Sequence, residues 1–189
     1  FVLVANPGTR DAQVTASYLL PDGTTIVKHY LVGAQSRFNI WVDHEDAALA
    51  NTAVSTVIES TNGVAVIAER ALWWGGASWI EAHNSAGSTT TGTKWAVADG
   101  QLGGERGIET YLLVANTSDH AGMVAVTLLF EDGTTRVRGY DVPARSRFNV
   151  NVANEFPSAT GKRFGAVVQS LGTTPAQIVV ERAMYSNAG

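Results

Sequence analysis

Asp22-Gly23-Thr24-Thr25 returns residue for residue as Asp132-Gly133-Thr134-Thr135, 110 positions further along the chain. An Asp-Gly pair between two apolar stretches supplies the positive φ that a tight hairpin turn requires. Each copy of this stretch therefore predicts a β-hairpin, with one strand on either side of the turn.

The repeat extends well beyond the turn. At the same offset of 110 residues, Leu3–Asn6 matches Leu113–Asn116, and Ser36–Asn39 matches Ser146–Asn149. After a two-residue slip, the Glu-Arg-Ala segments that close the two copies also match. Similarity at a fixed period is typical of tandem copies of one folding unit.

The stretch before each turn alternates in the way that a half-buried strand does. Side chains on a strand alternate between its two faces, so every second residue shares a face. In each copy the residues of one face are large and apolar, and we predict that they form the core: Val14, Ala16, Tyr18 and Leu20 in the first copy, and Val124, Val126, Leu128 and Phe130 in the second.

A second alternating stretch follows in each copy. Its inward face is predicted to carry Phe38, Ile40 and Val42 in the first copy, and Phe148, Val150 and Val152 in the second. Its outward face is predicted to carry Arg37, Asn39 and Trp41 in the first copy, and Arg147, Asn149 and Asn151 in the second.

Six such short strands per copy, joined by short turns, predict an all-β protein of two tandem immunoglobulin-like antiparallel β-sandwich domains. We place the first sandwich at residues 1–76 and the second at residues 95–189. Residues 77–94 form a connector rich in Gly, Ser, Thr and Trp. We also expect Trp95–Ala98 to supply an extra strand to the second domain.

Composition narrows the classes of partner. The net charge is −4 and the Lys and Arg residues are scattered, so we expect no nucleic acid partner. No apolar run approaches the roughly 20 residues that a membrane-spanning helix needs, so we expect no membrane insertion. The chain has no cysteine, which excludes disulfide bonds and thiolate metal sites.

The quoted motifs resemble a repeat of unknown function found in bacterial extracellular and cell-surface proteins. Its pattern is Trp-Tyr-x-Ala-Glu-Gly, aromatic-Leu-Leu-x-Ala-Asn-Pro, Leu-Pro-Asp-Gly-Thr, Ser-Arg-x-x-Val and Glu-Arg-x-Met-Tyr. The segments that match in order are Trp95–Gly100, Tyr111–Asn116, Phe130–Thr134, Ser146–Val150 and Glu181–Tyr185, and the first copy matches from Phe1 to Trp73. Asp99 departs from the pattern, which has Glu there. The resemblance implies a secreted sandwich repeat without known catalytic residues.

The repeated charges are Glu69-Arg70 and Glu181-Arg182. Neighbours on a strand point to opposite faces, so one member of each pair is expected to be buried against a partner. We interpret these residues as structural ion pairs that fix the strand register, and a ligand contact is the alternative. For Arg37 and Arg147 we also leave two interpretations open. Each arginine forms hydrogen bonds to backbone oxygens, or it contacts an anionic ligand.

Trp41 is unmatched, because its counterpart in the second copy is Asn151. With Trp73, Trp74 and Trp79 it forms our candidate ligand-binding site. Such an aromatic group suits the apolar faces of sugar rings, or it packs against the connector or another subunit.

Asp43-His44-Glu45-Asp46 is rich in oxygen ligands and suggests calcium, but it lacks the spacing of a calcium loop, so we predict a solvated turn and no metal site. The four histidines show no paired metal spacing, and no hydrolase nucleophile motif is present. Asn116-Thr117-Ser118 has the formal pattern of a glycosylation acceptor, a pattern that is common by chance.

The residues that recur are scaffold residues rather than reactive ones. We therefore predict a non-enzymatic structural or adhesive repeat, extracellular or at the cell surface, without a cofactor. The alternatives are a carbohydrate-binding module that uses the tryptophans and a calcium-stabilised adhesin. The expected partners are neighbouring repeats or identical subunits, with cell-surface glycans as a second class.

No counterpart of Trp95–Gly100 precedes Phe1. We therefore expect an open sheet edge in the first sandwich, which a neighbouring chain or an upstream repeat fills to give a filament or array.

Overall fold

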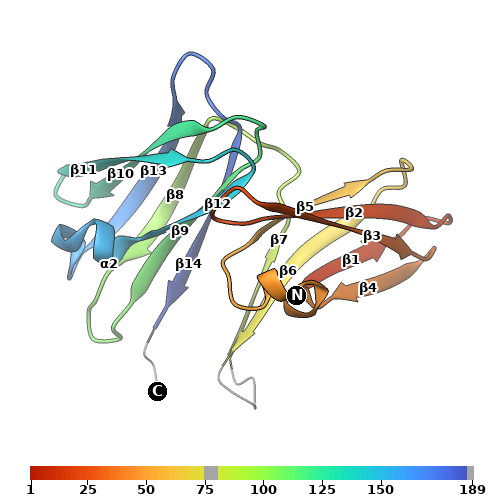
Figure 1. Cartoon of the computed structure of the whole chain (residues 1–189). Coiled ribbons are helices and arrows are strands. Elements are labelled where there is room, and N and C mark those ends of the chain that lie inside the picture. Colours follow the sequence, from red (N-terminus) through yellow and green to blue (C-terminus); the bar gives the residue numbers. More distant parts are fainter. Residues whose placement is uncertain (75–80, 187–189) are drawn as a thin grey trace. The chain divides into compact units, whose positions relative to one another are not determined.

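The computed structural model describes residues 1–74 and 81–186 and shows an all-β chain (Figure 1). Every strand pairing among the described residues is antiparallel. The chain divides into two compact units, one made of Phe1–Leu19 with Thr25–Thr89, the other of Leu20–Thr24 with Thr90–Gly189. Within the described residues each unit has two sheets.

The first sheet of the first unit has the strand order β4-β1-β6-β7, and the second has the order β3-β2-β5. The strands are β1 (Val2–Asn6), β2 (Ala12–Leu19), β3 (Thr25–Val32), β4 (Ser36–Ile40), β5 (Ser55–Ser60), β6 (Ile67–Trp74) and β7 (Glu81–Ala86). A short helix α1 (Val42–Glu45) and a 3-10 turn η1 (Ala47–Leu49) separate β4 from β5.

The second unit repeats this plan, with sheets ordered β12-β9-β14 and β11-β10-β13-β8. The strands are β8 (Lys94–Gln101), β9 (Glu109–Asn116), β10 (Gly122–Phe130), β11 (Thr135–Val142), β12 (Ser146–Asn151), β13 (Arg163–Leu171) and β14 (Ile178–Tyr185). The short helices recur as α2 (Val152–Glu155) and the 3-10 turn η3 (Pro157–Ala159).

Both predicted hairpins are confirmed. Gly23 and Gly133 have φ of 87° and 78°, a region that residues with a Cβ rarely adopt. The Asp22 side chain accepts a hydrogen bond from the amide of Thr24 at 2.9 Å, and Asp132 does the same for Thr134. The amide bond lowers the pKa of Asp22, and the pKa of Asp132 is lowered first by a hydrogen bond from the hydroxyl of Thr134 and then by the amide bond.

The predicted cores are also confirmed. Val14, Ala16 and Tyr18 are fully or almost fully buried, and so are their counterparts in the second unit. The core of the second unit takes side chains from both of its sheets, including Leu112 from β9 and Leu128 from β10. Two sheets packed face to face by their apolar sides account for the burial.

The interpretation of residues 77–94 as a connector needs correction, because β7 lies inside that range and pairs with β6. The expected extra strand of the second unit is present as β8, which pairs with β13. The segment between the two repeats therefore gives one strand to each unit.

A second correction concerns Arg147, which the alternation predicts to project outward from the sheet. Its side chain is buried and donates from Nε to Oδ1 of Asn149 at 2.5 Å. In the first copy Phe38, expected to be inward, is 39% exposed, although Ile40 and Val42 beside it are buried.

Candidate functional site

The candidate site in the first unit is an aromatic cluster of Phe1, Trp41, Trp73 and His44. Val2 pairs with Ile40 on one side and with Arg70 on the other, so Phe1 lies between the ends of β4 and β6. Two backbone hydrogen bonds join Phe1 to Ala71, at 2.8 and 3.0 Å. Strand pairing thus brings together aromatic residues that are far apart in the sequence.

The rings of this aromatic cluster pack on one another. The ring of Phe1 is 5.1 Å from that of Trp41 and 4.5 Å from that of Trp73, tilted in both cases. His44 stacks on Trp41 at 3.9 Å with an angle of 13° between the planes. Trp41 and Trp73 are still 38% and 40% exposed. The cluster therefore leaves part of both tryptophans accessible to solvent.

The other two tryptophans of the predicted site are placed differently. Trp74 follows Trp73 on β6 and therefore projects from the opposite face of the strand. Trp79 lies outside the described residues. A single platform of all the predicted tryptophans is therefore not formed on β6, and the site reduces to Trp41 and Trp73 with Phe1.

The second unit has a more polar version of the same cluster, which the sequence pattern does not reveal. Tyr111 and Tyr185 occupy the places of Phe1 and Trp73, with ring centres 5.7 Å apart. The hydroxyl of Tyr111 donates to Glu109 at 2.9 Å, and Asn151 donates to that hydroxyl at 3.2 Å. Burial, followed by the bond to Glu109, raises the pKa of Tyr111. The aromatic pair is common to both copies, whereas the exposed indoles are not.

The acidic stretch next to Trp41 is used by the fold. Glu45 accepts a hydrogen bond from the hydroxyl of Tyr30 at 2.7 Å. Asp46 accepts one from the amide of Ala48 and lies 3.7 Å from Lys28. Among residues 1–74 and 81–186, no three acidic or histidine side chains are grouped closely enough to hold a metal ion.

The bond between Tyr30 and Glu45 recurs between Tyr140 and Glu155, at 3.1 Å. It ties the short helix of each copy to β3 or β11. Burial raises the pKa of both tyrosines well above its usual value, and the neighbouring glutamate raises it further. The common offset of 110 residues between the two pairs is the sequence signal that identifies them.

Of the predicted structural ion pairs, Arg182 has a partner other than its neighbour Glu181. It donates to the carboxylate of Asp99 at 2.9 Å and to the backbone oxygen of Asp99 at 2.7 Å. This bond joins β14 to β8 across the two sheets. Glu69 and Arg70 lie on β6 at the matching positions and are half-buried.

Asn6 and Asn116 are buried and organise the loop after the first strand of each copy. The amide of Asn6 donates to the backbone oxygens of Arg10, Val32 and Gly33, and its side-chain oxygen accepts from the amide of Gly8. The side-chain amide of Asn116 donates to the backbone oxygens of His120 and Pro143, and its side-chain oxygen accepts from the amide of Ser118. Because Asn116 is fully buried, its glycosylation motif lies out of reach in the folded chain.

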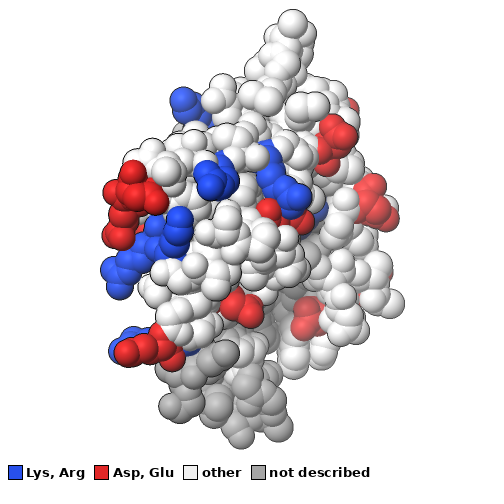
Figure 2. All heavy atoms as spheres, turned by 90° about the vertical axis from the view of Figure 1, so that its left-hand side faces the viewer, with Lys and Arg blue, Asp and Glu red and all other residues white. Residues whose placement is uncertain are grey.

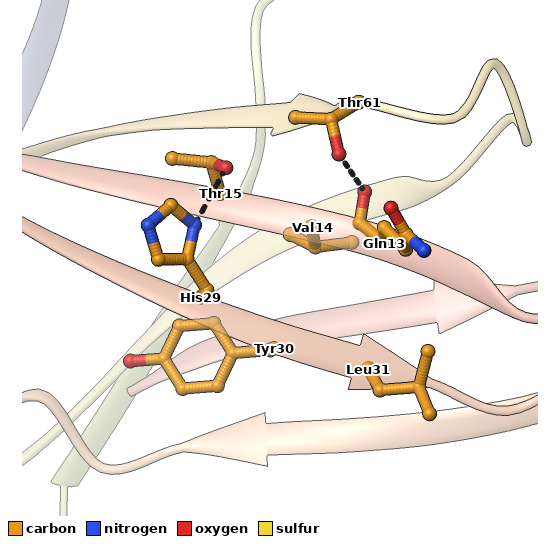
Figure 3. Close-up of a pocket in the computed structure, with 7 residues that line it drawn as sticks. All are labelled: Gln13, Val14, Thr15, His29, Tyr30, Leu31 and Thr61. Carbon is orange, nitrogen blue, oxygen red and sulfur yellow. Dashed lines mark hydrogen bonds between the residues drawn. The ribbon is translucent and has the colours of Figure 1, made fainter.

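A depression of about 380 Å³ lies over β2 and β3, and Figure 3 shows the residues that line it. Thr15 and His29 face each other there, with Oγ1 and Nδ1 3.1 Å apart. In the second copy Ala125 and Gly139 take their places. The hydroxyl–imidazole pair of this depression is therefore present in the first copy alone.

Charge on the surface is mixed. Figure 2 shows Lys and Arg side chains interspersed with Asp and Glu on the face that it presents, without a continuous patch of either sign. Within the described part of the chain, no helix has the length and apolar character needed to cross a membrane.

No protein-family model and no curated protein sequence matches the chain. Among solved structures, the Anabaena sensory rhodopsin transducer is 25% identical with a TM-score of 0.41, over 51% of this chain and 87% of the transducer. The crystal structure of Thermotoga maritima 1070 is 19% identical with a TM-score of 0.38, over 50% of this chain and 90% of that one. Similarity at this level does not transfer a function.

Proposed function

We propose that the chain is a non-enzymatic structural or adhesive repeat of the extracellular space or the cell surface, built from two immunoglobulin-like sandwiches. One observation carries the proposal: the residues that recur in both copies are those that hold the fold. They are the Asp-Gly turns, the buried asparagines and the tyrosine–glutamate pairs. A duplicated catalytic site would instead preserve reactive groups in both copies.

The junction between the copies supports a repeating array. β7 extends the sheet of β6, and β8 extends the sheet of β13. A junction of this kind gives one strand to the preceding copy and one to the following copy, so each further copy adds the same unit. We propose that the chain works in such an array, with neighbouring copies as its partners.

Light scattering of the full chain over a wide concentration range tests the assembly. We expect the average mass to rise above the 20.0 kDa of one chain as the concentration increases, because exposed strand edges pair with other strands. A mass of one chain at every concentration would contradict assembly through the exposed edges.

The exposed indoles of the first unit favour carbohydrate binding as a second candidate function. Sugar rings stack on aromatic faces, and Trp41, just after β4, and Trp73, on β6, are both partly exposed and both pack on Phe1. Glycan-array binding that is lost in Trp41→Ala and Trp73→Ala, and kept in Trp74→Ala, would support this function. Trp74 is the matched control because it projects from the other face of β6. Absence of binding to any glycan would remove the candidate.

A further inference from the structure

The outward face of the sheet β11-β10-β13-β8 is unusually apolar for a protein surface (Figure 1). Met123, Leu129, Val137 and Leu171 project from this face and are 50%, 42%, 61% and 37% exposed. The residues between them are mostly alanine, glycine, valine and threonine. Soluble proteins that act alone rarely leave a continuous apolar patch of this kind in water, so the face is a candidate interface.

The first copy shows that the fold does not require apolar residues on this face. At the 110-residue offset, Gln13 stands in the place of Met123 and Thr61 in the place of Leu171. The centre of the first copy's face carries the hydroxyl–imidazole pair described above, where the second copy has only alanine and glycine. The two copies share their cores and differ on this face, so its apolar character in the second copy calls for a partner.

Large and small side chains are arranged on the face so that two copies of it fit together. Leu129 on β10 pairs with Gly165 on β13, and Val137 on β11 lies in the same row across the sheet as Ala96 on β8. A two-fold axis parallel to the strands places β10 of one copy over β13 of the other, and β11 over β8. Leu129 then lies over Gly165 of the second copy, and Val137 over Ala96.

The charges on the two outer strands of the face complement each other in the same arrangement. Asp141 is on β11 and Lys94 is on β8, and both are exposed. The two residues lie one row apart, about 7 Å along the strands, a distance that a lysine side chain can span. The two-fold axis brings Asp141 of each copy near Lys94 of the other. This charge complementarity favours a second copy of the chain as the occupant.

We propose that two copies of the chain pair face to face through the sheet β11-β10-β13-β8. Four strands about 4.8 Å apart, with nine residues of about 3.3 Å in β10, cover roughly 500–600 Å² on each copy. The total of about 1,100 Å² lies at the lower end of specific interfaces, so the dimer is weak and reversible. The pairing closes at two copies and goes beyond the proposed array, in which copies join through strand edges.

Sedimentation equilibrium of the full chain, from micromolar to millimolar concentration, tests the pairing. We expect the average mass to rise with concentration and to level off at twice the 20.0 kDa of one chain. Met123→Gln/Leu171→Thr, which installs the first copy's residues, should raise the dissociation constant at least about tenfold, because it places polar groups in the contact. Thermal unfolding of the variant, unchanged from that of the parent chain, shows that the fold is kept.

The matched control is Leu31→Asp on β3 of the first copy. Leu31 is exposed and apolar, and Asp141 stands at its position in the second copy. The exchange therefore removes an exposed apolar side chain outside the proposed interface. It should leave the dissociation constant unchanged.

Charge reversal tests the orientation of the two copies. Asp141→Lys should weaken the dimer about three- to tenfold, because it brings two lysines together at each end of the contact. Lys94→Asp in the same chain should restore the dimer, because the double exchange re-forms both pairs with their charges swapped.

A parent chain that remains monomeric, or a dimer that Met123→Gln/Leu171→Thr leaves unchanged, would overturn the inference. A dimer that does not respond to the charge reversal would overturn its orientation. Mass that grows beyond two chains in both the parent and this variant supports the edge-joined array and rejects the face-to-face dimer. A dimeric parent with a monomeric variant supports the face and counts against assembly through strand edges, so the two proposals fail separately.

Discussion

A buried asparagine side chain ends the first strand of each copy and holds the loop that follows. Replacing Asn6 or Asn116 with Ala removes its hydrogen bonds and leaves backbone oxygens of the loops without a donor. We expect the free energy of unfolding to fall by about 2–4 kcal/mol in either variant, measured by urea denaturation. Asn39→Ala, at an exposed position of β4, should change it by less than about 0.5 kcal/mol. Unchanged stability in Asn116→Ala would contradict this role.

The tyrosine–glutamate pairs make stability depend on alkaline pH. Burial raises the folded-state pKa of Tyr30 and Tyr140 above the unfolded value of about 10. Their contribution is therefore fully present below about pH 10, and it is lost as the pH rises through the folded values. We expect the melting temperature to fall less steeply above about pH 10 in a Tyr30→Phe/Tyr140→Phe double variant. Parallel melting curves for the variant and the parent chain would count against these bonds.

Residue by residue, the repeat predicts which positions matter more reliably than what they do. The 110-residue offset marks Asn6 with Asn116 and Arg37 with Arg147, but the sequence gives no sign that Asn6 binds three backbone oxygens. The alternation of strand residues predicts that Arg147 points outward, but its side chain is buried. Alternation assigns a face of the sheet and leaves open what covers that face.

At the scale of elements, β8 needs a glycine where it crosses β13. A Cβ on Gly100 would lie 2.4 Å from the ring of Phe164, which is far inside van der Waals contact. We expect Gly100→Ala to lower the free energy of unfolding by about 1–3 kcal/mol, measured by urea denaturation. Phe164→Val in the same chain should recover part of the loss, because Val54 stands at that position in the first copy.

Gly139→Ala is the matched control, since it lies on strand β11 and a Cβ there meets nothing within 4 Å. It should raise the stability slightly, by about 0.5 kcal/mol, because it restricts the unfolded chain. Equal effects of the Gly100 and Gly139 substitutions would show that the packing on Phe164 is not tight.

The elements that the sequence predicts well are those whose pattern is local. In β2 and β10, large apolar residues alternate clearly with smaller or polar ones, and an Asp-Gly turn follows each strand. The positions and inward faces of these strands therefore follow from the sequence. β7 has no such pattern, because its residues Glu81–Ala86 are mostly small or polar, and it exists as a strand through its pairing with β6. The helices α1 and α2 are four residues long, which is too short for a periodic signal.

For the candidate site, outward projection of Trp41 was the useful prediction. The contacts of Phe1 with Trp41 and with Trp73 depend on the pairing of β1 with both β4 and β6, which the sequence does not specify. Adjacency in the sequence does not bring Trp73 and Trp74 into one site, because adjacent residues of a strand face opposite ways.

At the scale of the whole molecule, the calcium-stabilised adhesin predicts that EDTA lowers the melting temperature. We expect no change, because Glu45 and Asp46 already interact with Tyr30, Ala48 and Lys28. Thermal unfolding with and without EDTA, followed by addition of excess calcium, measures this. A fall in melting temperature that calcium reverses would favour the adhesin.

The central claim is that the two copies are the same module, in which β13 pairs with strands on both sides and β5, among the described residues, pairs with β2 alone. Hydrogen exchange of the dilute full chain, resolved for residues 56–60 and 166–170, tests it most directly. We predict slow exchange throughout 166–170 and fast exchange of the amides in 56–60 that point away from β2. Equal, complete protection of both segments in the single chain would contradict the claim.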